Sequence, residues 1–220
     1  MKRIIITGAS DGLGKELGKL CIENNVEVIC LSRTKPDYDC IHIETDLSKE
    51  DSIENACNEI KKNYVEFDAL VNCAAVISKQ KPNAISFEEL DNLMRVNALA
   101  PIYLASQLFD LIKENEADIM NVGSTVGTKA YEDQCAYGTS KWAIRGTSLN
   151  LQLELAKTRC RVIQFNPGGM NTKMFEKYNG VAIEKPEEWM NPKDIADVMF
   201  YILNLPKNVE VSEITINRKK

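Results

Sequence analysis

The sequence has a single histidine, His42, among its 220 residues. Hydrolases built on a Ser-His-Asp or Cys-His arrangement need a histidine beside the nucleophile. His42 lies in the alternating run Ile41-His42-Ile43, which is typical of a strand. We therefore expect it on a strand surface or in the core with its hydrogen bond satisfied, and the sequence argues against most hydrolases of these two types.

Paired cysteines are missing as well. The seven cysteines are scattered and odd in number, and no two of them form a C-x-x-C pair. This pattern indicates neither a zinc site nor a disulfide framework, and a chain of 220 residues can bury a core without disulfides. We therefore expect reduced core cysteines, no metal site and a cytoplasmic protein.

Long apolar runs are absent, and so are basic clusters before the end of the chain. No stretch of about 18 uncharged apolar residues exists that could span a membrane. Residues 1–10 reach a glycine after only three isoleucines, which predicts a strand rather than a secretion signal. The net charge of −5, with no basic run before 218–220, argues against nucleic acid as a partner.

Apolar runs rich in β-branched residues alternate with helical patterns along the chain. The strand-like runs lie at 4–7, 26–31, 41–43, 69–73, 119–122, 162–165 and 214–216. The helical patterns lie at 14–23, 49–63, 87–113, 137–156 and 192–203. We predict an α/β fold, a doubly wound parallel sheet of about seven strands with helices on both faces. No linker or repeat divides residues 1–220, so we expect one domain, with the irregular residues 166–191 as a substrate lid.

The first strand-like run leads into Thr7-Gly8-Ala9-Ser10-Asp11-Gly12-Leu13-Gly14, and a helical pattern follows at once. Such a turn places unpaired backbone N–H groups and the positive end of the helix dipole at one point, which binds phosphate. Glycines allow positive φ and let a pyrophosphate approach the backbone closely. We therefore predict a phosphate-bearing ligand here rather than an empty glycine-rich turn. A P-loop does not fit, because Glu16 follows Lys15.

Ser32, Arg33 and Thr34 follow the second strand-like run. In a dinucleotide-binding sheet an acidic residue at this place bonds the ribose 2′-hydroxyl of NAD, whereas an arginine accommodates the 2′-phosphate of NADP. Arg33, with Ser32 and the nearby Lys15, favours NADP(H) over NAD(H); the alternative is that Arg33 is a solvated loop charge. Asp46, after the third run, fits two roles, a cap on the next helix and an acceptor for the adenine amino group.

Ser124, Tyr137 and Lys141 form a second constellation. Ser124 follows the fifth run and so lies at the carboxyl edge of the sheet, where α/β folds hold ligands. Tyr137 and Lys141 are spaced i, i+4 and share one helix face. A phenol titrates at about pH 10, and a neighbouring ammonium favours the phenolate. Ser124 would then hold a carbonyl oxygen while Tyr137 supplies or removes its proton. Taken alone, the Tyr137–Lys141 spacing also fits a surface amphipathic pair.

These motifs resemble those of the short-chain dehydrogenase/reductase family, in its compact single-domain branch with a Rossmann fold, and the similarity covers residues 2–216. The family's T-G-x-x-x-G-x-G stands intact at 7–14, and its catalytic serine, tyrosine and lysine match the constellation above. The resemblance implies a fourth catalytic residue, Asn97, which in the family kinks its helix and holds a water of a proton relay through its backbone carbonyl. A buried, helix-interrupting amide is the alternative for Asn97.

The resemblance also implies cofactor contacts around the glycine turn, the ends of the second to fourth strands and the proline-glycine turn at 167–168. Asp46 matches the family's adenine-contacting aspartate, and Thr172 matches its nicotinamide-contacting threonine. The implied contacts are Thr7, Gly8, Ser10, Asp11, Gly12, Leu13, Gly14, Ser32, Arg33, Asp46, Leu47, Asn72, Ala74, Tyr137, Lys141, Pro167, Gly168 and Thr172.

The chain departs from the family pattern at two places. The family's N-A-A-G after the fourth strand reads Asn72-Cys73-Ala74-Ala75 here, which we expect to be a tolerated variation that puts Cys73 near the path of the adenosine. The glycine-rich tail that follows the last strand in many relatives, and contributes there to tetramer contacts, is absent. The sequence therefore predicts a homodimer or a homotetramer.

The leading hypothesis is an NADP(H)-dependent oxidoreductase of carbonyl reductase or alcohol dehydrogenase type. It would transfer hydride between the nicotinamide and a small carbonyl or alcohol substrate. We expect mostly apolar residues on the substrate side, namely Ile77, Val126, Gln134, Met170 and Met174. A core role fits the two methionines equally well, because methionine fills irregular gaps. The alternative function is a catalytically inert NADP-binding sensor or scaffold. The short segment after Thr172 argues against a sugar-nucleotide epimerase or dehydratase.

Overall fold

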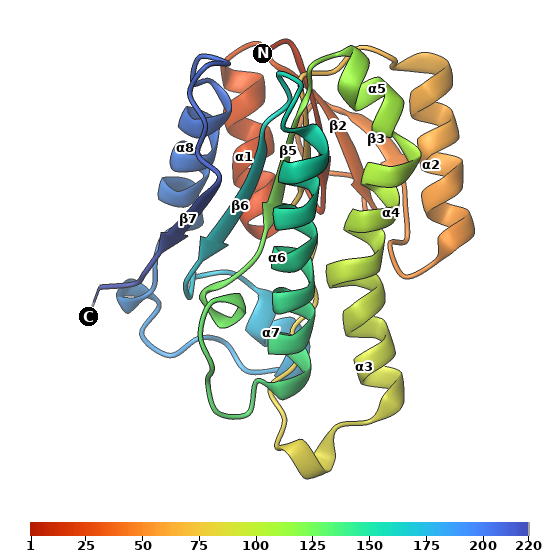
Figure 1. The fold of residues 1–220 in the computed structure, drawn as a ribbon. Helices are drawn as coiled ribbons and strands as arrows, with labels where there is room; N and C mark the ends of the chain where they lie inside the picture. The colour runs from red at the N-terminus through yellow and green to blue at the C-terminus, as the bar shows by residue number, and fades with distance from the viewer. Residues whose placement is uncertain (220) are drawn as a thin grey trace.

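The computed structural model describes residues 1–219. Seven parallel strands form one sheet in the order β3-β2-β1-β4-β5-β6-β7 (Figure 1). The chain starts in the middle of the sheet, builds outward to β3, crosses back and builds outward again to β7, which is the doubly wound topology. The strands are β1 (Arg3–Thr7), β2 (Glu27–Ser32), β3 (Ile41–Glu44), β4 (Ala69–Asn72), β5 (Asp118–Val122), β6 (Val162–Pro167) and β7 (Glu213–Ile216).

Helices cover both faces of this sheet (Figure 1). On one face α1 (Gly12–Glu23) packs beside α8 (Pro192–Leu203). The other face carries α2 (Glu50–Asn63), α4 (Ala100–Gln107), α5 (Phe109–Glu114) and α6 (Cys135–Leu155).

Successive side chains of each strand point to opposite faces, and both faces are core. Ile4 and Ile6 of β1 enter the core under α1 and α8, whereas Ile5 enters the core on the opposite face. All three isoleucines are fully buried, which explains the consecutive apolar residues of this run. The predicted fold, a doubly wound parallel sheet in one domain with helices on both faces, is confirmed.

The helical pattern over 87–113 is not one continuous helix, and the kink that the resemblance implies at Asn97 is present as a π-helical turn. The segment contains α3 (Phe87–Met94), a π-helical turn η2 (Arg95–Leu99), α4 and α5. Pro101 has no N–H, so the carbonyl of Asn97 has no donor at i+4. The N–H of Ala100 instead reaches back five residues to the carbonyl of Arg95, as in a π-bulge.

The shorter elements lie mainly near the carboxyl edge of the sheet. They are the 3₁₀ turns η1 (Pro82–Ala84), η3 (Thr125–Gly127) and η4 (Pro186–Glu188) and the short helix α7 (Met174–Asn179). The irregular segment 166–191 contains α7 and η4. No helix within residues 1–219 is both long and apolar enough to cross a membrane.

The prediction for the histidine is confirmed, whereas the one for the cysteines is only partly correct. A ring nitrogen of His42 lies 2.9 Å from the carbonyl oxygen of Ser32, so the histidine is satisfied, as predicted. All seven cysteines are free thiols. The expectation that all of them lie in the core is wrong, because Cys40 and Cys73 are half-buried and Cys135 is exposed.

Candidate active site

The sheet order brings the carboxyl ends of β1, β4, β5 and β6 together. β1 pairs with both β2 and β4, and the two halves of the chain wind away from this point. Ligands of open α/β sheets bind in the crevice outside this edge. The glycine turn, the loop after β4, Ser124 and the loop after β6 all lie at this edge.

The turn between β1 and α1 requires glycine. Gly8 and Gly12 have φ angles of +71° and +54°. A Cβ on Gly8 would lie 2.8 Å from the Cα of Ala74, and a Cβ on Gly14 would lie 2.6 Å from the carbonyl oxygen of Gly8. The turn therefore packs directly on the loop after β4. The N–H of Gly12, at the start of α1, donates to the Asp11 carboxylate at 2.8 Å.

Thr7 joins the glycine turn to the loop after β4 through its side chain. It is 1% exposed, and its Oγ1 accepts from the N–H of Cys73 at 3.0 Å and from the N–H of Ala74 at 3.1 Å. The hydroxyl is thus engaged within the protein. Of the implied cofactor contacts, Thr7 holds the shape of the turn rather than facing solvent.

Tyr137 and Lys141 project from α6 toward the end of β5. They are 7% and 2% exposed. The Nζ of Lys141 donates to the carbonyl oxygen of Val122 at 3.0 Å and lies 5.8 Å from the centre of the Tyr137 ring. Ser124 begins the turn after β5 and lies close enough to influence the phenol. The structure therefore brings these three side chains together at the carboxyl edge.

Burial controls the protonation of this pair. It raises the pKa of Tyr137 to about 12, and the Ser124 side chain lowers that pKa only in part. Burial also lowers the pKa of Lys141 to about 8, with the neighbouring Cys73 acting in the opposite direction. The expected lowering of the phenol pKa by the ammonium is therefore not seen in the protein's own environment. The phenol stays protonated at neutral pH, while the ammonium is close to its titration point.

Asn97 has a side chain fully occupied by structural hydrogen bonds. It is 2% exposed; Oδ1 accepts from the N–H of Val76, and Nδ2 donates to the Val76 carbonyl, both at 2.8 Å. Nδ2 also donates to the hydroxyl of Ser140 at 3.0 Å, next to Lys141. These bonds tie the π-helical turn to the loop after β4 and to α6. The side chain of Asn97 is therefore not free for a proton relay, and its backbone carbonyl, which has no donor at i+4, is the group that the resemblance implies for that role.

A ladder of buried polar side chains fixes α6 on the sheet. From Asn72 to Glu213 each side chain donates to the next, across β4, β5, β6 and β7. At the far end Glu213 also accepts from Arg145 of α6. The ladder runs Asn72–Asn121 (2.8 Å), Asn121–Ser148 (2.9 Å), Ser148–Gln164 (2.6 Å), Gln164–Asn166 (2.7 Å), Asn166–Glu213 (2.8 Å) and Arg145–Glu213 (2.8 Å). At the end nearest the glycine turn, the Oδ1 of Asn72 is buried without a hydrogen-bond partner.

Two of the five expected substrate-side residues pack with Tyr137. Ile77 and Val126 join it in a small apolar cluster. The amide oxygen of Gln134, the residue before α6, is buried without a hydrogen-bond partner. Met170 packs against the core under α1 and α8, which fits its core role, and Met174 begins α7. Within residues 1–219 no cluster of three or more His, Cys, Asp or Glu side chains is suited to a metal ion.

A sequence model of the family described as short chain dehydrogenase matches residues 2–181. The chain belongs to this family of oxidoreductases. Among curated relatives, an uncharacterized oxidoreductase of Staphylococcus aureus (strain MRSA252) is 26% identical over 226 residues, covering 98% of this chain and 96% of the relative. One of Staphylococcus epidermidis is also 26% identical, over 225 residues, with the same coverage.

Solved structures share the fold of this short-chain dehydrogenase. A serine dehydrogenase complexed with NADP+ superposes with a TM-score of 0.88 at 22% identity, covering 97% of this chain and 94% of the other. An alcohol dehydrogenase from Thermococcus sibiricus complexed with 5-hydroxy-NADP gives 0.88 at 23% identity, covering 99% and 97%. A 4-hydroxyisoleucine dehydrogenase complexed with NADH gives 0.87 at 24%, covering 99% and 98%.

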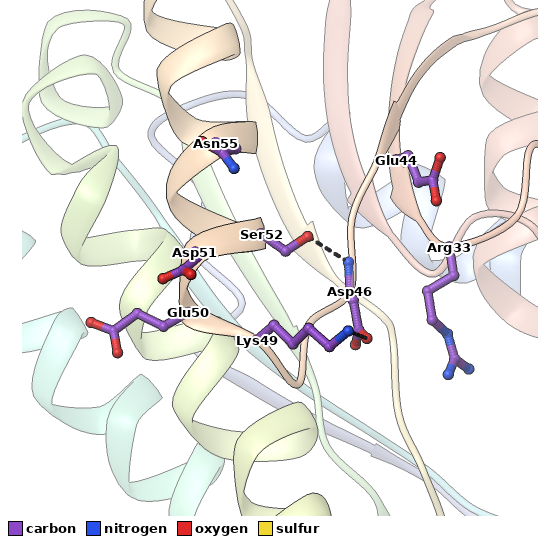
Figure 2. Close-up of a pocket in the computed structure, with 8 residues that line it drawn as sticks. All are labelled: Arg33, Glu44, Asp46, Lys49, Glu50, Asp51, Ser52 and Asn55. Atoms are coloured by element: carbon purple, nitrogen blue, oxygen red, sulfur yellow. Dashed lines mark hydrogen bonds and ion pairs between the residues drawn. The ribbon is translucent and has the colours of Figure 1, made fainter.

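A hollow of about 780 Å³ opens between the end of β2 and the start of α2 in this short-chain dehydrogenase (Figure 2). Asp46 forms the turn into α2, where its Oδ1 accepts from the N–H and the hydroxyl of Ser48 at 3.0 and 2.7 Å. These bonds shape the turn before α2, but the N-cap position of the helix is Lys49, which has no side-chain cap bond. Neither of the two roles that the sequence left open for Asp46 is therefore shown, and the adenine contact stays a prediction. The hollow is lined by Arg33, Glu44, Asp46, Lys49, Glu50, Asp51, Ser52 and Asn55.

Arg33 forms no ion pair or hydrogen bond with the residues that the structure describes. Figure 2 shows its guanidinium extending away from the other labelled side chains. Lys15, in contrast, forms an ion pair with Asp37, with 2.7 Å between its Nζ and the Oδ2 of the carboxylate. The Ser32 hydroxyl donates to the carbonyl of Thr34 at 2.7 Å. Leu13 and Leu47 bury their side chains in the core, so only their backbone can face a ligand.

The segment 166–191 returns to the glycine turn. Pro167 ends β6, and the N–H of Gly168 donates to Ile216 of β7 at 2.8 Å. A Cβ on Gly12 would lie 3.6 Å from the methyl group of Thr172, so the two predicted cofactor regions meet. The sequence separates these residues widely, and the fold brings them together.

Trp189 anchors the far end of this segment. A Cβ on Gly169 would lie 2.4 Å from the Trp189 ring, so the indole packs directly on the backbone. Phe175 of α7 meets the indole edge-on at 5.5 Å between ring centres, and the Arg218 guanidinium lies 4.8 Å from the indole centre. The residues after β7 thereby contact the segment that covers the glycine turn.

Tyr38 is a supporting residue that sequence reasoning missed. From the loop after β2 it donates to the carbonyl of Ala9 in the glycine turn at 3.0 Å. The phenol can reach the turn only because residue 18 is a glycine: a Cβ at that position would lie 2.0 Å from the phenol oxygen. The available signal was Gly18 itself, since a glycine inside a helix often marks a close approach.

Proposed function

We propose that this short-chain dehydrogenase transfers hydride between NADP(H) and a small carbonyl or alcohol substrate, with Ser124, Tyr137 and Lys141 as its acid/base system. One observation carries the proposal. Tyr137 and Lys141 are buried side by side at the carboxyl edge, and the lysine has a single carbonyl partner. A buried ammonium with so few partners is costly for folding, and perturbed groups of this kind concentrate at functional sites.

A nicotinamide dinucleotide fits the residues at the edge. The glycine turn forms a cradle that side chains would fill, and the start of α1 offers N–H groups and a helix dipole to a pyrophosphate. The buried Oδ1 of Asn72 and the methyl of Thr172 border the same region. When bound, the cofactor supplies the hydride and, in its oxidised form, a positive charge.

The chain's own residues would handle the proton. Ser124 would donate a hydrogen bond to the substrate oxygen, and Tyr137 would give or take the proton of that oxygen. Because its pKa is raised to about 12, the Tyr137 phenol keeps its proton at neutral pH, and it can still give that proton to an alkoxide, which is a far stronger base. Lys141, with a pKa of about 8, would give a proton back to the Tyr137 phenolate and regain it from solvent through a water held by the backbone carbonyl of Asn97. In this proposal Asn97 would act through its backbone, and the bonds of its side chain to Val76 would hold the π-helical turn in place.

The preference for NADP(H) rests on Arg33. Its guanidinium is unpaired at the end of β2, beside the hollow that would take the adenosine. Related folds occur with either cofactor, since the serine dehydrogenase was solved with NADP+ and the 4-hydroxyisoleucine dehydrogenase with NADH. We therefore base the preference on this side chain alone.

The substrate would lie between the apolar cluster around Tyr137 and the 166–191 segment. Ile77 and Val126 supply apolar walls, and the unpartnered amide oxygen of Gln134 offers one polar handle. A small carbonyl compound with a hydrogen-bond donor fits this combination. A substrate contact for Met174 stays a prediction, and so does a cytoplasmic location, which the free cysteines favour.

We also propose a homodimer. Trp142, Leu149 and Leu153 lie on one face of α6 and are 47%, 45% and 78% exposed. Leu99 and Ile102, on the neighbouring η2–α4 segment, are 50% and 40% exposed. Contiguous exposed apolar residues mark association surfaces. Light scattering of the protein and of Leu153→Lys tests this, since the substitution should yield a monomer.

The decisive experiment is a hydride-transfer assay with NADPH and a panel of small aldehydes, ketones and diketones. Oxidation of NADPH with at least one of these supports the enzyme. An inert sensor or scaffold, the alternative function, would bind NADPH tightly and oxidise none of them.

A further inference from the structure

An ion pair crosses from the 166–191 segment to the glycine turn. Lys177 of α7 bonds the carboxylate of Asp11, 166 residues earlier in the chain. The other oxygen of that carboxylate accepts from the N–H of Gly12 at 2.8 Å. A carboxylate of the chain itself therefore lies on the first N–H of α1, where a helix N-terminus attracts anions.

Lys173 adds a second positive charge on the same face of α7. The N–H of Lys177 donates to the carbonyl of Lys173 at 2.9 Å, which places the two lysines one helical turn apart. Burial alone would raise the pKa of Asp11, but bonds from Lys177 and Gly12 and the charges of both lysines lower it overall. Lys177 of α7 thus lies at the point where the glycine turn would receive a pyrophosphate, and Lys173, just before α7, adds its charge to the same region.

The Asp11–Lys177 pair is poorly suited to a purely structural role. Its side chains are 41% and 64% exposed, and ion pairs in water contribute little to stability. A pyrophosphate carries more charge and more acceptor oxygens than one carboxylate, so it would compete well for both the helix N-terminus and the lysines. The same geometry that holds Asp11 would hold a phosphate oxygen.

We infer that Lys177, supported by Lys173, is a ligand of the cofactor pyrophosphate, and that Asp11 is an internal anion which holds these lysines over the glycine turn until the pyrophosphate replaces it. This inference rests on the proposed binding of a nicotinamide dinucleotide. It makes an unusual prediction: neutralising the two partners of one ion pair changes cofactor affinity in opposite directions.

The test compares wild type with Lys177→Gln, Asp11→Asn and the control Lys185→Gln. Lys185 is a matched control because it is also an exposed lysine of the same segment, paired with Glu188. Kd values for NADPH and NADH are measured by fluorescence titration at low and high salt. Lys177→Gln should raise both Kd values about three- to fivefold and flatten their salt dependence, and Asp11→Asn should lower both about twofold. Lys185→Gln should leave them unchanged.

Adenosine 2′,5′-bisphosphate serves as a probe without a pyrophosphate, and its Kd should not respond to Lys177→Gln. Parallel weakening by Lys177→Gln and Asp11→Asn would show a structural strap and overturn the inference, as would an unchanged Kd in Lys177→Gln. If wild type binds neither NADPH nor NADH, the proposed function itself fails, which is a different result from these two.

Discussion

The two edges of the sheet each bury a cation, and they treat it differently. At the amino edge Arg161 is 4% exposed and bonds both oxygens of Asp118 and the carbonyls of Leu203, Leu205 and Val209. Lys207 adds a bond to Asp118 at 2.7 Å. At the carboxyl edge Lys141 is 2% exposed and has one carbonyl acceptor.

This difference separates structure from function. A buried cation whose donors are all hydrogen-bonded is part of the structure of the fold. Removing one partner of such a pair leaves the other charge buried without compensation, which destabilises the protein. A buried ammonium with a single acceptor destabilises the fold and is retained for another reason, in line with the general conflict between stability and activity. The predictions below test this contrast, starting with the largest effect.

Tyr137→Phe should abolish most of the proposed hydride-transfer activity and leave the fold intact. Without the phenol hydroxyl no group can pass a proton to the substrate oxygen, so kcat should fall about 10²- to 10⁴-fold. Steady-state kinetics with NADPH and the best substrate measure this, with Tyr201→Phe as an exposed control. An unchanged Kd for NADPH and an unchanged melting temperature should accompany the loss. Near-normal turnover would remove Tyr137 from the mechanism.

Arg161→Met, at the amino edge, should have the opposite effect: it should lower the stability of the fold and leave the site at the carboxyl edge unchanged. It leaves the buried Asp118 carboxylate with Lys207 as its only charged partner, and the free energy of unfolding should fall by about 3–5 kcal/mol. Urea denaturation measures this. The control Arg159→Met removes an exposed pair with Glu116 and should change stability by no more than about 0.5 kcal/mol. If the two variants lose similar amounts, the amino edge is not the structural clamp described here.

Lys141→Met should stabilise the protein while stopping turnover. The pKa of Lys141 is lowered from 10.5 to about 8 in the fold, so below pH 8 the folded state bears the full cost of a buried ammonium. Removing it should raise the free energy of unfolding by up to about 3 kcal/mol at pH 7. The gain should shrink between pH 8 and 10.5, as the wild-type lysine loses its proton in the fold.

Denaturation at pH 7 and pH 10 measures that trend. A loss of stability at pH 7 in Lys141→Met would mean that the lysine is a structural residue like Arg161, and the contrast between the two edges would disappear.

Arg33→Ala removes an unpaired cation of the carboxyl edge that is exposed rather than buried. Its loss should cost no stability, but it should raise the Kd for NADPH about tenfold and leave the Kd for NADH nearly unchanged. Lys49→Ala, in the same hollow, is the control. Equal losses for both cofactors would make Arg33 a bystander, and the cofactor preference would need another origin.

Most of the fold follows from local pattern. The strand runs predict their strands within two residues, because strands covered on both faces need consecutive apolar residues, as Ile4, Ile5 and Ile6 show. The helix over 192–203 matches α8 at both ends, since Asn191 caps it and Pro192 begins it. The break at 95–99 does not appear in the hydrophobic periodicity, which continues through a π-bulge, and only the resemblance implied a kink at Asn97.

The site was only partly accessible from the sequence. The motif spacing places Tyr137 beside Lys141 because one helix carries both, and the serine follows from the strand end. The surroundings of these groups come from other elements: burial lowers the pKa of Lys141, Cys73 opposes that shift, and the carbonyl of Val122 accepts its hydrogen bond. Contacts such as Asp11–Lys177 depend on the path of an irregular segment, for which the chain has no periodicity to reveal the register.

The stacking of Arg218 on Trp189 means that a residue after β7 helps to set the shape of the 166–191 segment. Arg218→Ala should therefore loosen the 166–191 segment from a distance. If this segment borders the substrate as proposed, the variant should accept a wider range of molecules, while Ser124, Tyr137 and Lys141 stay as they are. Arg218 is therefore a suitable position for directed evolution toward new substrates, because it lies outside the proposed acid/base system of Ser124, Tyr137 and Lys141.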